Sequence, residues 1–150
     1  MQDIAGCRIT VADIAAQEQT ISLLRDAFRE CKIVDRRLRP SHGYRAVHVI
    51  ANIEDVSIEI QVRSSIQHLW AELSERLSDV VDSRLKYGGG DPKVSEMLLS
   101  MSKHIDELEE LERRAIATSD AHLHEVVETM KSRASTELRN RINQIEARRR

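Results

Sequence analysis

Two short stretches of the sequence carry polar side chains at alternate positions, which is the spacing of one face of a β-strand. One reads Gly-Tyr-Arg-Ala-Val-His over residues 43–48, and the other reads Ser-Ile-Glu-Ile-Gln-Val-Arg over residues 57–63. The polar side chains that share a side are Tyr44 and His48 on the first stretch and Glu59, Gln61 and Arg63 on the second. An aromatic ring, an imidazole, a carboxylate and a guanidinium on two strands favour a binding face over a plain solvent-facing surface.

Two carboxylates fall where neighbouring strands are expected. Asp3 comes just before a strand predicted at Cys7–Val11, and Glu59 lies within the later one. Magnesium binds hard oxygen ligands, commonly one or two carboxylates together with phosphate oxygens, and a carboxylate beside a hydroxyl group can act as a general base. Asp3 and Glu59 are therefore a candidate metal and catalytic pair. The alternative is that Asp3 caps the chain and Glu59 is a surface residue.

Tyr44 and His48 suit the recognition of a nucleotide. A tyrosine directly after a glycine can present its ring to a purine, and stacking of this kind contributes roughly 1–3 kcal/mol per base. His48 can form hydrogen bonds with a base, a ribose or a phosphate. The alternative is that Tyr44 packs at the edge of the strand and His48 is a structural histidine.

Arginines gather in the N-terminal half, where their planar guanidinium groups suit bidentate contacts with phosphate. They are Arg8, Arg36, Arg37, Arg39, Arg45 and Arg63. The net charge of the chain is −2, so no overall field attracts it to nucleic acid or to a membrane. An anion site must therefore be local, and we expect no DNA partner.

Composition narrows the remaining possibilities. The 150 residues allow one domain with an appendage, and an aromatic content of 3% means that the core is built from aliphatic side chains. Cys7 and Cys31 lack a paired-cysteine motif and are expected to be reduced and buried. Neither a signal peptide nor a stretch long enough to span a bilayer is visible, so we expect a cytoplasmic protein without a membrane partner.

The polar stretches lie among other predicted elements. A second strand is expected over 31–34, a loop over 36–43, and an antiparallel strand pair over 45–51 and 56–62. Asp13 is the expected cap of a helix that ends near residue 30. A further helix over 64–86 has an apolar face that is expected to cover the sheet.

The remainder of the chain is predicted to be helical. Residues 88–90 are three glycines, and Asp91 followed by Pro92 is typical of a helix start. No glycine or proline follows Pro92, which favours a helical hairpin or an extended two-segment helix with a turn near residues 118–120. Its narrow apolar stripe must pack on the core, on its own second half, or on another chain.

Three ordered motifs resemble the synthetase domain of RelA/SpoT-type alarmone synthetases, which are GTP/GDP pyrophosphokinases. They are Asp-Ile-Ala-Gly-Cys-Arg over 3–8, Gly-Tyr-Arg-Ala-Val-His over 43–48, and Glu-Ile-Gln-Val-Arg over 59–63. Gln-His-Leu-Trp-Ala-Glu over 67–72 and Lys-Tyr over 86–87 are also similar to that family. The resemblance predicts a synthetase-like domain over 1–87, a glycine-rich hinge over 88–91 and a helical region over 92–150.

The resemblance implies an α/β (α+β) fold, a nucleotidyltransferase-like mixed sheet flanked by helices and followed by the C-terminal helical hairpin or extension. It implies transfer of pyrophosphate from ATP to the 3′-hydroxyl of GDP or GTP, with Mg²⁺ as cofactor. Asp3 then corresponds to the magnesium-binding aspartate, and Glu59 to a second catalytic carboxylate that binds metal or activates the hydroxyl. Tyr44 corresponds to the guanine-stacking tyrosine.

The other residues expected to bind the guanine nucleotide are His48, Arg45, Gln61, Arg63 and Arg39. One departure from the family concerns its ATP-binding segment, which precedes the Asp-x-x-Gly-x-Arg motif at which this chain begins. We therefore expect an N-terminally truncated form with impaired transfer. The alternatives are a guanine-nucleotide-binding module without catalysis, pyrophosphate transfer to tRNA, and self-association through the C-terminal helices.

Overall fold

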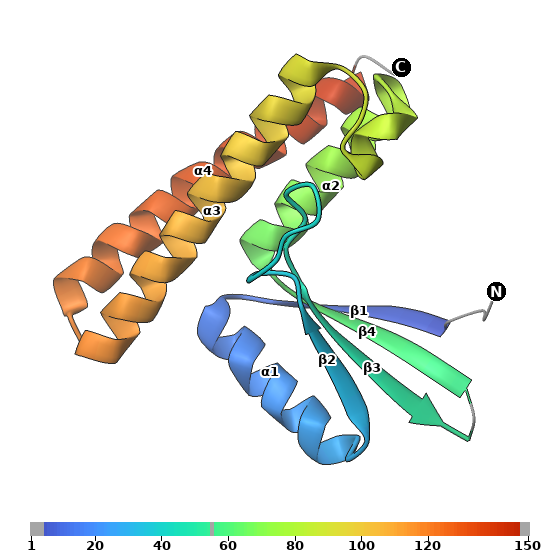
Figure 1. The fold of residues 1–150 in the computed structure, drawn as a ribbon. Helices are drawn as coiled ribbons and strands as arrows, with labels where there is room; N and C mark the ends of the chain where they lie inside the picture. The colour runs from blue at the N-terminus through green and yellow to red at the C-terminus, as the bar shows by residue number, and fades with distance from the viewer. Residues whose placement is uncertain (1–4, 55, 148–150) are drawn as a thin grey trace. The chain divides into compact units, whose positions relative to one another are not determined.

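The computed structural model describes residues 5–54 and 56–147, which group into two units. The first unit comprises residues 5–41 and 45–65, and the second comprises residues 42–44 and those from 66 onward. In the first unit lie the elements β1 (Ala5–Val11), α1 (Ile14–Ala27), β2 (Cys31–Asp35), β3 (Val47–Ile53) and β4 (Val56–Ser64) (Figure 1).

The strands form one mixed sheet in the order β1-β4-β3-β2. β4 lies parallel to β1 and antiparallel to β3, and β2 is antiparallel to β3. α1 packs on one face of this sheet, where the buried side chains are Ile21, Val47, Val49, Ile60 and Val62. The predicted mixed α/β fold and the predicted antiparallel pair are therefore confirmed.

Two polar side chains fix α1 on the sheet. The carboxylate of Asp13 accepts a hydrogen bond of 2.7 Å from the backbone amide of Ala16, which confirms the predicted cap. Gln17 is fully buried, and its Nε2 atom donates a 2.8 Å hydrogen bond to the carbonyl of Val62. A buried amide must find such a partner, so this contact also sets where α1 crosses β4.

The cysteines differ from expectation in one respect. Both are free thiols, as predicted. Cys31 is half-buried, but Cys7 is exposed on β1, so its predicted burial is wrong. The reason is that β1 is an edge strand whose Ala5–Arg8 segment is exposed throughout.

The second unit is helical. It contains α2 (Ser65–Val80, from Ile66 onward), a short 3-10 helix η1 (Ser83–Tyr87), α3 (Pro92–Thr118) and α4 (Ala121–Ala147). The helix predicted over 64–86 is thus two elements, because Asp82 caps η1 by accepting a hydrogen bond from the Arg84 amide.

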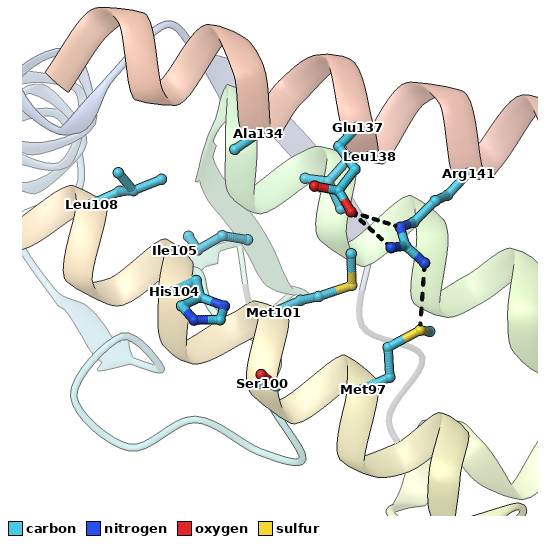
Figure 2. Close-up of a pocket in the computed structure, with 10 residues that line it drawn as sticks. All are labelled: Met97, Ser100, Met101, His104, Ile105, Leu108, Ala134, Glu137, Leu138 and Arg141. Carbon is cyan, nitrogen blue, oxygen red and sulfur yellow. Dashed lines mark hydrogen bonds and ion pairs between the residues drawn. The ribbon is translucent and has the colours of Figure 1, made fainter. Parts of the chain in front are cut away.

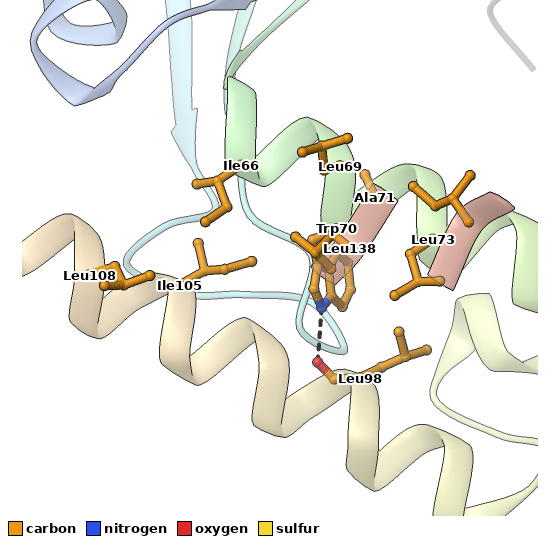
Figure 3. Packing of buried hydrophobic residues seen from close by; sticks show 10 residues of the cluster. Ile66, Leu69, Trp70, Ala71, Leu73, Leu98, Ile105, Leu108 and Leu138 are labelled. Carbon is orange, nitrogen blue, oxygen red and sulfur yellow. Dashed lines mark hydrogen bonds between the residues drawn. The ribbon is translucent and has the colours of Figure 1, made fainter. Parts of the chain in front are cut away.

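The apolar face of α2 packs on α3 and α4 (Figure 3). The cluster consists of Ile66, Leu69, Trp70, Ala71, Leu73, Leu98, Ile105, Leu108, Leu138 and Ile142. The prediction that this face covers the sheet is therefore wrong, since its buried side chains belong to the helical cluster and not to the cluster between α1 and the sheet.

α3 and α4 form an antiparallel hairpin, which is one of the two predicted arrangements (Figure 1). α3 ends where Ser119 adopts a left-handed conformation with φ 51°, and the carboxylate of Asp120 accepts a hydrogen bond from Leu123 at the start of α4. Residues 88–91 lie inside the second unit. The predicted domain and hinge boundaries stay a prediction.

A buried ion pair joins the two helices of the hairpin. The Nζ atom of Lys131 on α4 lies 2.6 Å from Oε1 of Glu112 on α3, and both side chains are almost fully buried. Burial alone would lower the pKa of Lys131, but hydrogen bonds and charge from Glu112 and Glu128 outweigh it and raise that pKa above 10.5. The pair therefore stabilises the fold fully below pH 10.5, and this contribution is lost as the pH rises through the raised pKa.

Among the residues that the structure describes, no helix is both long and apolar enough to cross a membrane.

Replacement of Lys131 by Met should destabilise the hairpin, because it leaves the Glu112 carboxylate buried without its cation. We expect the free energy of unfolding to fall by about 3 kcal/mol or more, as measured by urea denaturation. The control is Lys103→Met on an exposed lysine of α3, which should change stability by less than about 0.5 kcal/mol. Equal effects of the two substitutions would contradict a structural role for the pair.

Candidate functional site

Four side chains form a hydrogen-bonded row on the face of the sheet opposite α1. Nδ1 of His48 lies 2.7 Å from Oε1 of Glu59, and Nε2 of Gln61 donates a 3.2 Å hydrogen bond to Oε2 of the same carboxylate. Nη2 of Arg63 donates a 2.9 Å hydrogen bond to Oε1 of Gln61. We call these four residues the polar row. The structure thus brings together four of the residues that alternation singled out.

The pleat of the strands explains why the row exists. Ile60 and Val62 point to the cluster under α1, so their neighbours on β4 point the other way. β3 is paired with β4 so that His48 lies opposite Gln61. The imidazole therefore reaches Glu59 diagonally across the two strands, a distance that long side chains can bridge.

Glu59 is held as a carboxylate. Its partial burial would raise its pKa, but hydrogen bonds from Gln61 and His48, and the charges of His48 and Arg36, lower that pKa below its usual value of 4.5. Each oxygen accepts one hydrogen bond within the row, and the side chain is 28% exposed. A carboxylate oxygen accepts more than one partner, so Glu59 can still receive a hydroxyl proton or a cation.

The arginines of the 36–43 loop differ sharply in their surroundings. Arg37 is only 9% exposed at its side chain, where it binds Asp35 through Nε and Nη2 and binds Glu18 through Nη1 at 2.6 Å. Burial would raise the pKa of Asp35, but Arg37 outweighs it and lowers that pKa. Arg37 therefore ties β2 to α1 and serves the fold, whereas Arg36 and Arg39 are exposed.

Two further predicted nucleotide-binding residues are not members of the polar row. Arg45 is 9% exposed, and its Nη1 donates a 2.8 Å hydrogen bond to the carbonyl of Arg37, so it supports the same loop. Tyr44 belongs to the second unit, where it is half-buried against the helical cluster. Contacts of Arg39, Arg45 and Tyr44 with a nucleotide stay predictions.

The predicted magnesium pair is described only in part. Asp3 lies outside the described residues, so its role stays a prediction. In the described part of the chain no group of three His, Cys, Asp or Glu side chains is placed to hold a metal ion. Glu59 itself fits one ligand position, because it is an ionised and partly exposed oxygen donor of the kind that Mg²⁺ prefers.

Sequence reasoning did not find a hollow of about 330 Å³ between α3 and α4 (Figure 2). Met97, Met101 and Leu108 line it together with other apolar side chains. Arg141, which also lines it, is engaged by Glu137 at 2.7 Å and by the sulfur of Met97. The hollow therefore has the lining of an apolar surface and not that of a phosphate site.

Comparison with known proteins gives a family for the region that contains the polar row. The family model described as "Region found in RelA / SpoT proteins" matches residues 1–79, which is more than half of the chain. Uncharacterized proteins from Mycobacterium bovis and Mycobacterium tuberculosis are 41% identical over 91 residues. These matches cover 58% of this chain and only 33% of the curated relatives.

Solved structures agree with this assignment. The small alarmone synthetase 1 from Bacillus subtilis, bound to its product pppGpp, superposes with a TM-score of 0.59 and 27% identity, over 81% of this chain and 65% of that one. A GTP pyrophosphokinase family protein from Streptococcus pneumoniae shares the fold, with a TM-score of 0.56 and 19% identity over 85% and 64% of the two chains. The predicted resemblance is confirmed, and the chain belongs to the RelA/SpoT family.

Proposed function

We propose that this protein takes part in alarmone synthesis, the transfer of pyrophosphate from ATP to the 3′-hydroxyl of GDP or GTP. The observation that carries the proposal is the polar row, in which an ionised carboxylate is held from both sides on a sheet face. Support comes from the family and from the B. subtilis enzyme, whose structure contains the product pppGpp. The proposed substrates are therefore a guanine nucleotide and ATP.

The chemistry of the transfer is consistent with such a carboxylate. The 3′-oxygen forms a bond with the β-phosphorus of ATP, the bond from that phosphorus to the α,β-bridging oxygen breaks, and AMP leaves while the hydroxyl loses its proton. Phosphoryl transfer depends mainly on positioning and charge stabilisation. Because a general base works best with a pKa near 7, the lowered pKa of Glu59 favours a role in orienting the hydroxyl or holding a cation.

Magnesium would supply charge neutralisation at the phosphates when bound. Glu59 would provide one oxygen ligand, and we propose Asp3 as a second because of its place in the Asp-x-x-Gly-x-Arg motif. The exposed Arg36 and Arg39 are the proposed phosphate contacts of the loop, since Arg37 is engaged by Asp35 and Glu18. For the base, we propose that Tyr44 stacks on guanine, on the strength of its place in the Gly-Tyr-Arg-Ala-Val-His motif.

Replacement of Glu59 by Gln tests the catalytic part of the proposal. Gln keeps the shape of the side chain and removes the charge, so transfer of labelled pyrophosphate from ATP to GDP should fall by about 100-fold or more while GDP still binds. The matched control is Glu30→Gln, on an exposed residue of the same unit, which should leave transfer unchanged.

The same experiment separates the outcomes. Equal transfer by the Glu59→Gln variant and the wild-type chain would contradict the assigned role of the carboxylate. GDP binding by the wild-type chain without any transfer would replace the proposed enzyme with a guanine-nucleotide-binding module. A wild-type chain that neither binds GDP nor transfers pyrophosphate would overturn the proposal.

The pKa of Glu59 is a second test, made in magnesium-free buffer by carbon-13 NMR. In the wild-type chain the group should titrate below 4.5, so its contribution to stability is present above pH 4.5 and lost as the pH falls through the lowered pKa. His48→Ala should raise this pKa, because a hydrogen bond that lowers it is removed while Gln61 and partial burial remain. An unchanged pKa in the His48→Ala variant would show that the 2.7 Å contact is not formed in solution.

A further inference from the structure

We infer that Ser102 on α3 is a positioning residue for guanine binding, because it fixes the backbone from which Tyr44 presents its ring. This inference rests on the proposed function, in which Tyr44 stacks on the base. Ser102 lies well outside residues 1–79, which match the family model, so that match assigns it no role. All the contacts involved lie within the second unit.

The central contact is a short buried hydrogen bond. Oγ of Ser102 donates to the carbonyl oxygen of Gly43 at 2.6 Å, and Ser102 is only 3% exposed. The peptide group that contains this carbonyl also contains the backbone nitrogen of Tyr44, and a peptide group is planar. A hydrogen bond that fixes the Gly43 carbonyl therefore also fixes the backbone nitrogen and Cα of Tyr44, which lie in the same plane. The Tyr44 side chain is attached to that Cα.

The indole ring of Trp70 approaches the same backbone closely. Gly43 has a positive φ of 86°, and a Cβ atom at this position would lie 2.8 Å from a ring carbon of Trp70 and 3.3 Å from Cβ of Ser102. Only glycine permits both the conformation and the close approach. The indole is itself fixed, since its Nε1 donates a 2.9 Å hydrogen bond to the carbonyl of Leu98 on α3 (Figure 3).

The residue before Gly43 is held in a comparable way. His42 also has a positive φ, of 52°, as at the first of two central positions in a type I′ turn. Its imidazole occupies the space beside Gly88, where a Cβ atom would overlap the ring. Gly88 is the left-handed cap of η1, so the glycine-rich segment accommodates the turn. Tyr44, on the other side, packs partly against the helical cluster.

These contacts have a consequence for binding. A residue that already occupies its binding position avoids the entropic cost of ordering when the ligand arrives, and this preorganisation increases affinity. Removal of the Ser102 hydroxyl leaves the buried Gly43 carbonyl without this donor, which favours other positions of the turn. The affinity for guanine nucleotide should therefore depend on a helix that never has to touch the nucleotide.

The test compares Ser102→Ala with Ser78→Ala in the full chain. Ser78 is equally buried, but its hydroxyl binds the Ser74 carbonyl of its own helix, so it is a matched loss of one buried hydroxyl. Titration calorimetry should show a GDP dissociation constant about tenfold higher for Ser102→Ala and unchanged for Ser78→Ala. Ser102→Cys, which keeps a weak donor, should give an intermediate value.

Two further readouts distinguish positioning from general loss of stability. Trp70 is the only tryptophan of the chain, so its fluorescence reports directly on the contact with Gly43. Its emission should change in Ser102→Ala and stay the same in Ser78→Ala, without ligand. An equal loss of GDP affinity in both variants, accompanied by equal falls in melting temperature, would overturn the positioning role.

Tyr44→Ala separates the failure of this inference from that of the proposed function. If Tyr44→Ala loses GDP affinity while Ser102→Ala binds within about twofold of wild type, the inference is wrong and the proposed function stands. If Tyr44→Ala binds GDP as the wild-type chain does, guanine stacking is wrong and the inference fails with it. Loss of GDP affinity in Tyr44→Ala and in Ser102→Ala, but not in Ser78→Ala, supports the positioning role of Ser102 and the proposed function alike.

Discussion

The alternation of side chains along β4 is the constraint on which the first unit depends. β4 is hydrogen-bonded on both sides, parallel to β1 and antiparallel to β3. Its odd-numbered residues from 59 to 63 form three members of the polar row, and its even-numbered residues pack under α1. A shift of one residue in register would exchange the two faces, so the same pairing that buries the core also exposes the carboxylate.

The arginines between β2 and β3 likewise divide into those that stabilise the fold and those that remain exposed. Arg37 and Arg45 are nearly buried and hold the loop between β2 and β3, through Asp35, Glu18 and a backbone carbonyl. Arg36 remains exposed and acts on the pKa of Glu59 through its charge. In this arginine-rich loop, the guanidinium groups of Arg37 and Arg45 are therefore engaged by groups of the fold itself. Only the exposed arginines of the loop can bind an anionic ligand.

The sequence was sufficient for features that depend on local periodicity. Alternation along residues 57–63 placed Glu59, Gln61 and Arg63 on one face, and Asp13 was recognisable as a cap because capping involves residues three apart. The helical spacing of α2 showed that one face is buried but not which partner covers it, and the expected partner was wrong. The periodicity of apolar residues indicates which face of a helix is buried, whereas tertiary packing determines which element covers that face.

Contacts between distant residues left no comparable signal in the sequence. Ser102 and Gly43 are 59 residues apart, and nothing in the spacing of either residue indicates the other. The same is true of Lys131 and Glu112, which read as ordinary charges on solvated helices and are in fact buried. The structural roles of such residues can be recognised only in the folded structure, because each role depends on a contact with a residue that is distant in the sequence.

In the proposed function, the Gly43–Tyr44 turn of the second unit binds the guanine base. The most direct measurement is a map of backbone amide chemical shifts during titration with GDP and, separately, with ADP. We expect GDP to shift the backbone amides of Gly43 and Tyr44, and ADP at equal concentration to shift them much less. Shifts confined to the hollow between α3 and α4, or identical shifts with both nucleotides, would contradict it.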